Sequence, residues 1–146
     1  AAANNKELEN FYPAFKAVKD YVVQAPEKTT GWYLPSIGQW YDFTANLGGL
    51  PSWDDGINEG NDLTPNLYRW SNQTELVSKI NAYFEPLGTG NYDAIPNGSY
   101  QKFFSSSTYS DSGIWTWFVG KQANVVRCWH NVRYNSDSAV RPILAF

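Results

Sequence analysis

The sequence predicts an α+β domain in which helices pack against twisted antiparallel sheets, and two observations support this class. Apolar residues at helical spacing recur through the first half of the chain. From Phe103 to Phe146, short aromatic and β-branched runs alternate with clusters of Ser, Asp, Gly and Asn, which is typical of a meander of antiparallel strands. The chain has 146 residues and no internal repeat, so we expect one domain over residues 1–146.

The first helix is expected from about Pro13 to Gln24. Proline is acceptable in a first helical turn, and four apolar residues follow at helical spacing: Phe11, Phe15, Val18 and Val22. The segment that starts at Ala25-Pro26 ends this helix, and a short strand is expected at Trp32–Leu34.

Two further helices are expected before the strands begin. Ser36 is the predicted N-cap of the second helix, which ends at Gly48-Gly49 and carries an inner face of Trp40, Phe43 and Leu47. Ser71 is the predicted N-cap of the third helix, which ends at Pro86–Gly88 and carries an inner face of Leu76, Ile80 and Phe84.

The remaining chain is expected to form strands, and its apolar end is informative. Ile114 to Val119 alternates as a strand does, and Ile143 to Phe146 is too apolar for a solvated tail. We therefore expect a buried C-terminal strand, with Leu144 and Phe146 packed beside an N-terminal element.

Composition and charge exclude several classes of function. The formal net charge is −3 without a basic run, so nucleic-acid binding is not expected. No apolar stretch approaches the length of a membrane span, so none is expected in this chain. The sequence starts at Ala1 and contains no Met, which predicts a processed or trimmed start that a leader could have preceded.

Aromatic side chains are abundant, with seven Trp and ten Tyr. A core of this size cannot enclose them all, so several rings are expected at the surface, where they would serve recognition of carbohydrate or protein. The alternative is that the rings fill a loop-rich fold that is short of aliphatic residues.

The residues that most often perform catalysis are scarce. His130 is the single histidine, and Cys128 is the single cysteine, expected as a buried free thiol that leaves no disulfide within the chain. The serines Ser105 to Ser107 lack the G-x-S-x-G turn that presents a nucleophile. We expect no enzyme and no cofactor.

An acidic segment is the weak candidate for a metal site. Its carboxylates could surround Ca²⁺, which prefers six to eight oxygen ligands: Asp54, Asp55, Glu59 and Asp62. Their spacing differs from the D-x-[DN]-x-[DN]-G loop, so we favour a solvated acidic loop and predict no metal.

Two long irregular segments, Gly48 to Trp70 and Leu87 to Tyr100, are the candidates for ligand binding. Long loops within a domain of this size are usually functional. The expected aromatic contacts are Trp53, Trp70, Tyr92 and Tyr100, and the expected polar partners are Asn91, Asp93 and Asn97. The alternative is that these rings attach the loops to the body of the domain.

Four segments in a fixed order resemble a known bacterial family: W-x-L-P-S at Trp32–Ser36, aromatic-S-S-S at Phe103–Ser107, a W/F strand ending in Gly at Trp115–Gly120, and V-R-x-x-x-A-F at Val140–Phe146. This order is similar to the Lcl C-terminal-type branch of the C-type-lectin-like fold, which is common in surface proteins of gut Bacteroidetes. The resemblance covers about Ala14 to Phe146, with nothing matched between Gly48 and Trp70.

The resemblance implies a C-type-lectin-like fold with long irregular loops and a ligand surface at Tyr92 to Tyr100. The chain departs from the animal lectins, because Glu85-Pro86-Leu87 and Trp129-His130-Asn131 stand where their calcium and sugar signatures would be. It also lacks the cysteine pairs of the formylglycine-generating enzymes, which share the broad fold.

The expected function is therefore a non-catalytic, adhesin-like domain of a secreted or cell-surface protein, such as a fimbrial tip, which binds a glycan or a protein. One alternative is a structural domain that docks a neighbouring domain or subunit. Another is an enzyme domain of the formylglycine-generating-enzyme-like branch.

Overall fold

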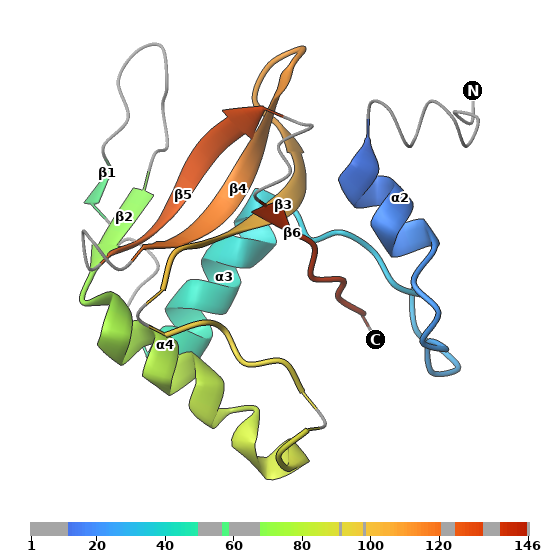
Figure 1. Cartoon of the computed structure of the whole chain (residues 1–146), viewed down its shortest axis with the longest axis horizontal. Coiled ribbons are helices and arrows are strands. Elements are labelled where there is room, and N and C mark those ends of the chain that lie inside the picture. The colour runs from blue at the N-terminus through green and yellow to red at the C-terminus, as the bar shows by residue number, and fades with distance from the viewer. Residues whose placement is uncertain are drawn as a thin grey trace.

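The computed structural model describes residues 12–49, 57–58, 68–90, 92–97, 99–120, 125–132 and 138–145 (Figure 1). The described part is α+β, as the sequence predicts. Its helices are α2 (Pro13–Lys19), α3 (Ile37–Gly48), α4 (Gln73–Ala82) and the 3-10 helix η2 (Glu85–Leu87). Its strands are β1 (Ile57–Asn58), β2 (Tyr68–Ser71), β3 (Gln101–Thr108), β4 (Gly113–Gly120), β5 (Val125–Val132) and β6 (Ser138–Ala139).

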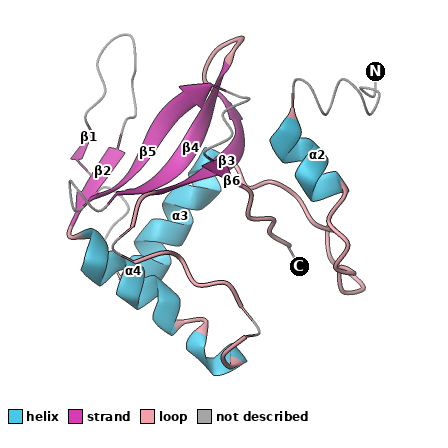
Figure 2. Cartoon of the chain, viewed as in Figure 1, coloured by secondary structure: helices cyan, strands magenta, loops and turns pink. Residues whose placement is uncertain are grey.

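The described strands form one mixed sheet in the order β1-β2-β5-β4-β3-β6. The strands β3, β4 and β5 make the antiparallel meander that the sequence predicts, with Trp117 paired to Phe103 on one side and to Cys128 on the other. The short strand β6 runs parallel to β3 at the edge. The chain after β6 turns away from the sheet at this edge (Figure 2).

The helix α3 begins and ends where the sequence predicts. The Ser36 side chain accepts a hydrogen bond from the Gln39 amide, and the Gln39 side chain accepts one from the Ser36 amide, which completes a capping box. Gly49 ends the helix in the left-handed conformation. A Cβ atom on Gly48 would lie 2.8 Å from Leu76, so a glycine there lets α3 and α4 approach closely.

The main core lies between α3, α4 and one face of the sheet, and two indole rings are at its centre. Trp40 of α3 stacks on Trp117 of β4 with ring centroids 4.9 Å apart. The Trp117 Nε1 donates to the Thr44 hydroxyl at 2.7 Å, and the Trp40 Nε1 donates to the Phe104 carbonyl at 3.1 Å. Both indoles are therefore buried with their polar atoms satisfied.

A second, smaller core lies on the opposite face of the sheet, where α2 packs. Neighbouring strand residues point to opposite faces, so Phe103 enters the main core and Phe104 enters the second one. Ala14 and Val18 of α2 pack there together with Leu34. Each of the two faces of the sheet is thus covered in part by helices.

The prediction that the first helix reaches Gln24 was wrong, because α2 ends at Lys19. Val22 was expected on the inner face and is 93% exposed. The β-branched pair Val22-Val23 disfavours helix, and the Val23 carbonyl accepts a hydrogen bond from the Trp32 side chain instead. Phe11 lies outside the described residues.

The prediction of Ser71 as an N-cap was also wrong. Ser71 is the last residue of β2 and still pairs with Val125, and Asn72 takes the N-cap position of α4 in the left-handed conformation. Asn tolerates this conformation better than most residues do. Of the expected inner face, Leu76 and Ile80 are buried, whereas Phe84 lies beyond the end of α4 at Ala82 and is half-buried. Val77, which was not expected there, is buried as well.

The C-terminal segment lies beside an N-terminal element, but it is not a strand of the sheet. Tyr33 and Ile143 form a single antiparallel bridge, with amide-to-carbonyl distances of 3.0 and 2.9 Å. The Thr30 amide donates to the Ala145 carbonyl at 3.0 Å. Leu144 is half-buried, which is less than we expected, and Phe146 lies outside the described residues.

Candidate functional site

A groove of about 540 Å³ opens where three distant parts of the chain meet. The first part brings Tyr21 and Trp32 from the loop after α2, and the second runs from Phe84 to Pro96. The third is the segment Ala139–Pro142, which leaves β6. Most of these lining residues lie in loops, and Gln101 and Phe103 of β3 complete the lining.

One wall of the groove is an aromatic pair. The rings of Tyr21 and Trp32 meet edge to face, with centroids 5.1 Å apart. The Trp32 Nε1 donates to the Val23 carbonyl at 2.7 Å, which fixes the orientation of the indole. Tyr21 is 43% exposed, so this wall presents apolar ring surface to a ligand at small cost in conformational entropy.

A second wall, formed by the segment around Tyr92, is held by a side chain of α4. Asn81 donates to the Ile95 carbonyl and accepts from the Ile95 amide, each at 2.8 Å. This two-bond clamp sets Ile95 into the main core, where it is 1% exposed. Tyr92 then packs on Phe84 with ring centroids 5.8 Å apart, so the wall is built on a fixed support.

Arg141 lies in the groove between the loop and the C-terminal segment. Its Nη2 donates to the Asp93 carbonyl at 2.7 Å, and its guanidinium carbon lies 5.3 Å from the centroid of the Phe84 ring. Burial lowers the pKa of Arg141, and the nearby Asp93 carboxylate acts in the opposite direction. The ordinary pKa of arginine is so high that the side chain stays charged.

The groove therefore combines apolar rings with a few polar groups, which is the usual make-up of a ligand site. The polar groups are the Arg141 guanidinium, the Asp93 carboxylate, the Gln101 amide and the hydroxyls of Tyr21 and Tyr92. They can bind and orient a ligand through hydrogen bonds.

Two of the seven predicted ligand-binding residues, Tyr92 and Asp93, come together in this groove. Tyr100 is 59% exposed and lies elsewhere, against Phe118, with centroids 5.0 Å apart. Trp53 and Asn91 lie outside the described residues.

Trp70 and Asn97 have structural surroundings that the sequence did not predict. Trp70 is only 2% exposed and packs edge to face on Tyr41 in the main core, so the expectation of a surface contact was wrong. The reason is its register, since it pairs with Val126 on the covered face of the sheet. The exposed Asn97 amide donates to the Thr74 carbonyl and the Ser78 hydroxyl, which attaches its loop to α4.

Sequence reasoning did not select Tyr21, Trp32 and Arg141 as ligand contacts. Trp32 and Arg141 each belong to one of the four segments that carry the family resemblance, and this was the available signal. Nothing in the local sequence shows that these segments meet, because the meeting depends on the pairing of Tyr33 with Ile143.

The side chains that could perform nucleophilic chemistry have structural partners. The buried Ser105 hydroxyl donates to the Trp115 carbonyl at 2.7 Å, and the Ser107 hydroxyl accepts from the Ile37 amide at 3.0 Å. His130 stacks on Tyr109 with centroids 4.5 Å apart. Cys128 is a free, buried thiol, and burial raises its pKa, which opposes formation of a reactive thiolate.

Neither a metal-binding cluster nor a membrane-spanning helix is found in the described part of the chain. Among the described residues, no group of three or more His, Cys, Asp or Glu side chains is arranged to hold a metal ion. The acidic candidates Asp54, Asp55, Glu59 and Asp62 lie outside these residues. No helix in the described part of the chain is long and apolar enough to cross a membrane.

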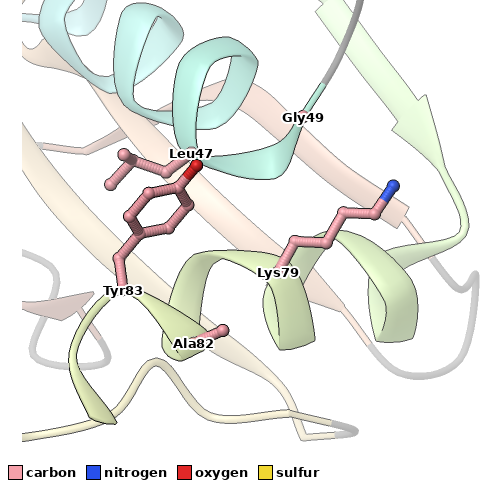
Figure 3. Close-up of a pocket in the computed structure, with 5 residues that line it drawn as sticks. All are labelled: Leu47, Gly49, Lys79, Ala82 and Tyr83. Carbon is pink, nitrogen blue, oxygen red and sulfur yellow. The ribbon is translucent and has the colours of Figure 1, made fainter. Parts of the chain in front are cut away.

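A second depression lies between α3 and α4 (Figure 3). It measures about 330 Å³, and Leu47, Gly49 and Ala82 form much of its lining. Tyr83 points across it toward Leu47, whereas Lys79 extends along α4 and pairs with Glu75 at 2.8 Å (Figure 3). With its one cation already paired, this site offers less specific chemistry than the groove does.

The outer face of the sheet carries a third feature, a cluster of rings and cations that we call the outer strip: Tyr100, Lys102, Phe118, Arg127 and Trp129. The Arg127 guanidinium lies between two rings, 4.8 Å from Phe118 and 4.4 Å from Trp129. Lys102 lies 5.3 Å from the Tyr100 ring. The strip is separate from the groove, whose lining contains none of these residues.

Comparisons of the chain with models of known protein families, with curated proteins and with solved structures found no match.

Proposed function

We propose that this chain is a non-catalytic, adhesin-like domain that binds a glycan, of the Lcl C-terminal-type branch of the C-type-lectin-like fold. The proposal places it in a secreted or cell-surface bacterial protein. The groove between Trp32, Tyr92 and Arg141 is the observation that carries it.

The chemistry of the groove favours a sugar. Sugar rings present apolar C–H faces that pack on indole and phenol rings, and hydroxyl groups that need paired donors and acceptors. Trp32 and Tyr92 supply the ring surfaces, and Asp93 and Gln101 supply polar atoms beside them. The supports of both walls are fixed by hydrogen bonds, which limits the entropy that binding would cost.

The family assignment rests on the order of the four sequence segments. Three structural features are compatible with it. The helix α3 begins directly after Trp32–Ser36, and residues 140–145 lie beside the first segment through the Tyr33–Ile143 bridge. The separation of a helical half from a three-stranded meander is compatible as well.

A glycan array probed with the isolated chain tests this function, followed by titration of the best ligand. Truncation of an aromatic anchor typically costs at least about 2 kcal/mol, so Tyr92→Ala should weaken binding about thirtyfold. Tyr83→Ala is the matched control, since Tyr83 is 60% exposed and lies outside the groove. Equal losses of glycan affinity in Tyr92→Ala and Tyr83→Ala, or an array on which no glycan is bound, would refute the proposal.

The outer strip favours a second candidate, a structural domain that docks an acidic surface of a neighbouring domain or subunit. Its two cations, Lys102 and Arg127, are held over rings and present positive charge beside apolar surface. A photo-crosslinking amino acid at position 100 should then give one discrete protein adduct that Arg127→Glu abolishes. The same probe at position 92 would give that adduct if docking used the groove instead.

A further inference from the structure

We propose that the groove selects acidic glycans, with the carboxylate of a sugar acid bound by the Arg141 guanidinium. This inference rests on the proposed glycan binding and names the class of ligand.

The bonding of Arg141 leaves most of its donors open. A guanidinium has five N–H donors in one plane, and the described residues take one of them, through the bond from Nη2 to the Asp93 carbonyl. The guanidinium carbon lies over the Phe84 ring, 5.3 Å from its centroid, and a phenyl ring has no lone pair to accept these bonds. Donors at the edge of the plane therefore remain for a ligand in the groove.

The charge of Arg141 also lacks a close partner. Within the described part of the chain, no carboxylate lies at ion-pair distance from it, and the ion pairs found there are between Lys16 and Asp20 and between Lys79 and Glu75. Arg141 is partly buried, so water screens its charge less than at an open surface. A ligand carboxylate would supply the missing counter-charge.

Among the described residues that line the groove, Asp93 is the only charged one besides Arg141. The Asp93 carbonyl accepts the hydrogen bond from Arg141, while the exposed Asp93 carboxylate lies beyond ion-pair distance from the Arg141 guanidinium. The carboxylate is near enough to favour the charged form of Arg141, so it reduces the local positive potential without cancelling it. A hydroxyl-bearing ligand would find Asp93 as a hydrogen-bond acceptor beside the cation.

The planar fork of arginine suits a planar carboxylate, which it binds through two parallel hydrogen bonds. The rings of Trp32 and Tyr92 line the same groove, so a sugar ring that carries the carboxylate would have apolar surfaces to pack against. A carboxylate without a sugar ring would gain only the hydrogen bonds to Arg141 and no packing against these rings. A sugar acid, either a uronic acid or a nonulosonic acid such as sialic acid, gains both.

Matched glycan pairs test the inference directly. The probes are an oligosaccharide that ends in a uronic acid, its carboxyl-reduced form, a sialylated oligosaccharide and its methyl ester. Each is titrated by calorimetry against the wild type, Arg141→Gln and Arg141→Lys. Hydrogen bonds to charged groups contribute enough for a preference of about ten- to hundredfold for the acidic member of at least one pair.

The variants separate this inference from the function on which it rests. Arg141→Gln should weaken binding of the acidic member of a pair much more than binding of the neutral member, and so remove the preference for the acidic form. Arg141→Lys should keep the charge but lose part of the preference, because ammonium lacks the fork. Tyr92→Ala should weaken binding of both members of a pair equally, since the rings contact the sugar whether or not it is charged.

Three results would overturn the inference. Equal affinity of the wild type for both members of every pair would do so while leaving glycan binding intact. If Arg141→Gln loses affinity equally for both members of a pair, with an unchanged melting temperature, then Arg141 only shapes the groove. Absence of binding to any glycan would overturn the proposed function and this inference together. If Arg141→Gln does not fold, Arg141→Lys and the methyl ester still decide the question.

Discussion

Replacing Thr44 by valine tests how α3 is joined to the sheet, with almost no change in side-chain shape. The Thr44 hydroxyl donates to the Trp40 carbonyl at 2.8 Å and accepts from the Trp117 Nε1 at 2.7 Å. Thr44 and Trp117 are both 0% exposed, so water cannot replace the lost partner. Valine would leave the Trp117 N–H buried without an acceptor.

The size of the effect follows from that single orphaned donor. An unsatisfied buried polar group costs about 1–3 kcal/mol. The extra methyl group of valine offsets up to about 0.8 kcal/mol through burial of apolar surface. The Trp40 carbonyl loses little, since it can keep its bond within the helix. We therefore expect Thr44→Val to lower the free energy of unfolding by about 1–2 kcal/mol, or the melting temperature by about 2–8 °C.

The assay is urea denaturation followed by circular dichroism, in a double-mutant cycle with Trp117→Phe. Phenylalanine removes the donor, so the cost of Thr44→Val should fall by about 1–2 kcal/mol in that background. Thr44→Ser is the control that keeps the hydroxyl and loses a methyl group. If Thr44→Val costs the same in both backgrounds, the hydrogen bond to Trp117 contributes nothing and the reasoning is wrong.

Three more outcomes are expected. Asn81→Ala removes both bonds to Ile95 and should lower stability by about 1–3 kcal/mol, with faster hydrogen exchange at the Ile95 amide; unchanged exchange would contradict the clamp. Burial raises the pKa of the Cys128 thiol, so its contribution to stability is complete below the unfolded pKa of about 8.5 and is lost as pH rises above it. Urea midpoints of the wild type and Cys128→Ala should therefore converge or cross above about pH 9, and iodoacetamide should label the wild type only after unfolding; rapid labelling of the folded protein would refute the burial argument. In a chelator the melting temperature should stay within about 1 °C, and a rise of several degrees with millimolar Ca²⁺ would show a site that we did not predict.

Elements with strong local signals were predicted well, and α3 shows why. Its N-cap at Ser36 and its ending at Gly49 depend on residues within one turn of each helix end, so the sequence carries the information locally. Helical spacing alone was weaker evidence. Val22 continues the spacing of Val18, yet α2 has already ended at Lys19 and Val22 is 93% exposed.

Features that depend on pairing between distant segments could not be predicted in the same way. The burial of Trp70 follows from its register with Val126, and a shift of one residue would have placed its ring on the other face. The groove was even harder to predict, because its residues come from positions 21 to 142 and share no local pattern. The sequence indicated one of its walls, at Tyr92 and Asp93, through the length and composition of that loop.

The same contacts that shape the groove also couple its walls. Asn81 fixes Ile95, Asp93 lies two residues before it, and the Asp93 carbonyl holds Arg141 of the C-terminal segment. That segment is held in turn by Tyr33, next to Trp32 in the aromatic wall. A ligand that contacts both Trp32 and Arg141 would therefore also stabilise the bridge between Tyr33 and Ile143. Hydrogen exchange at the Tyr33 and Ile143 amides should slow when such a ligand binds, although neither residue lines the groove.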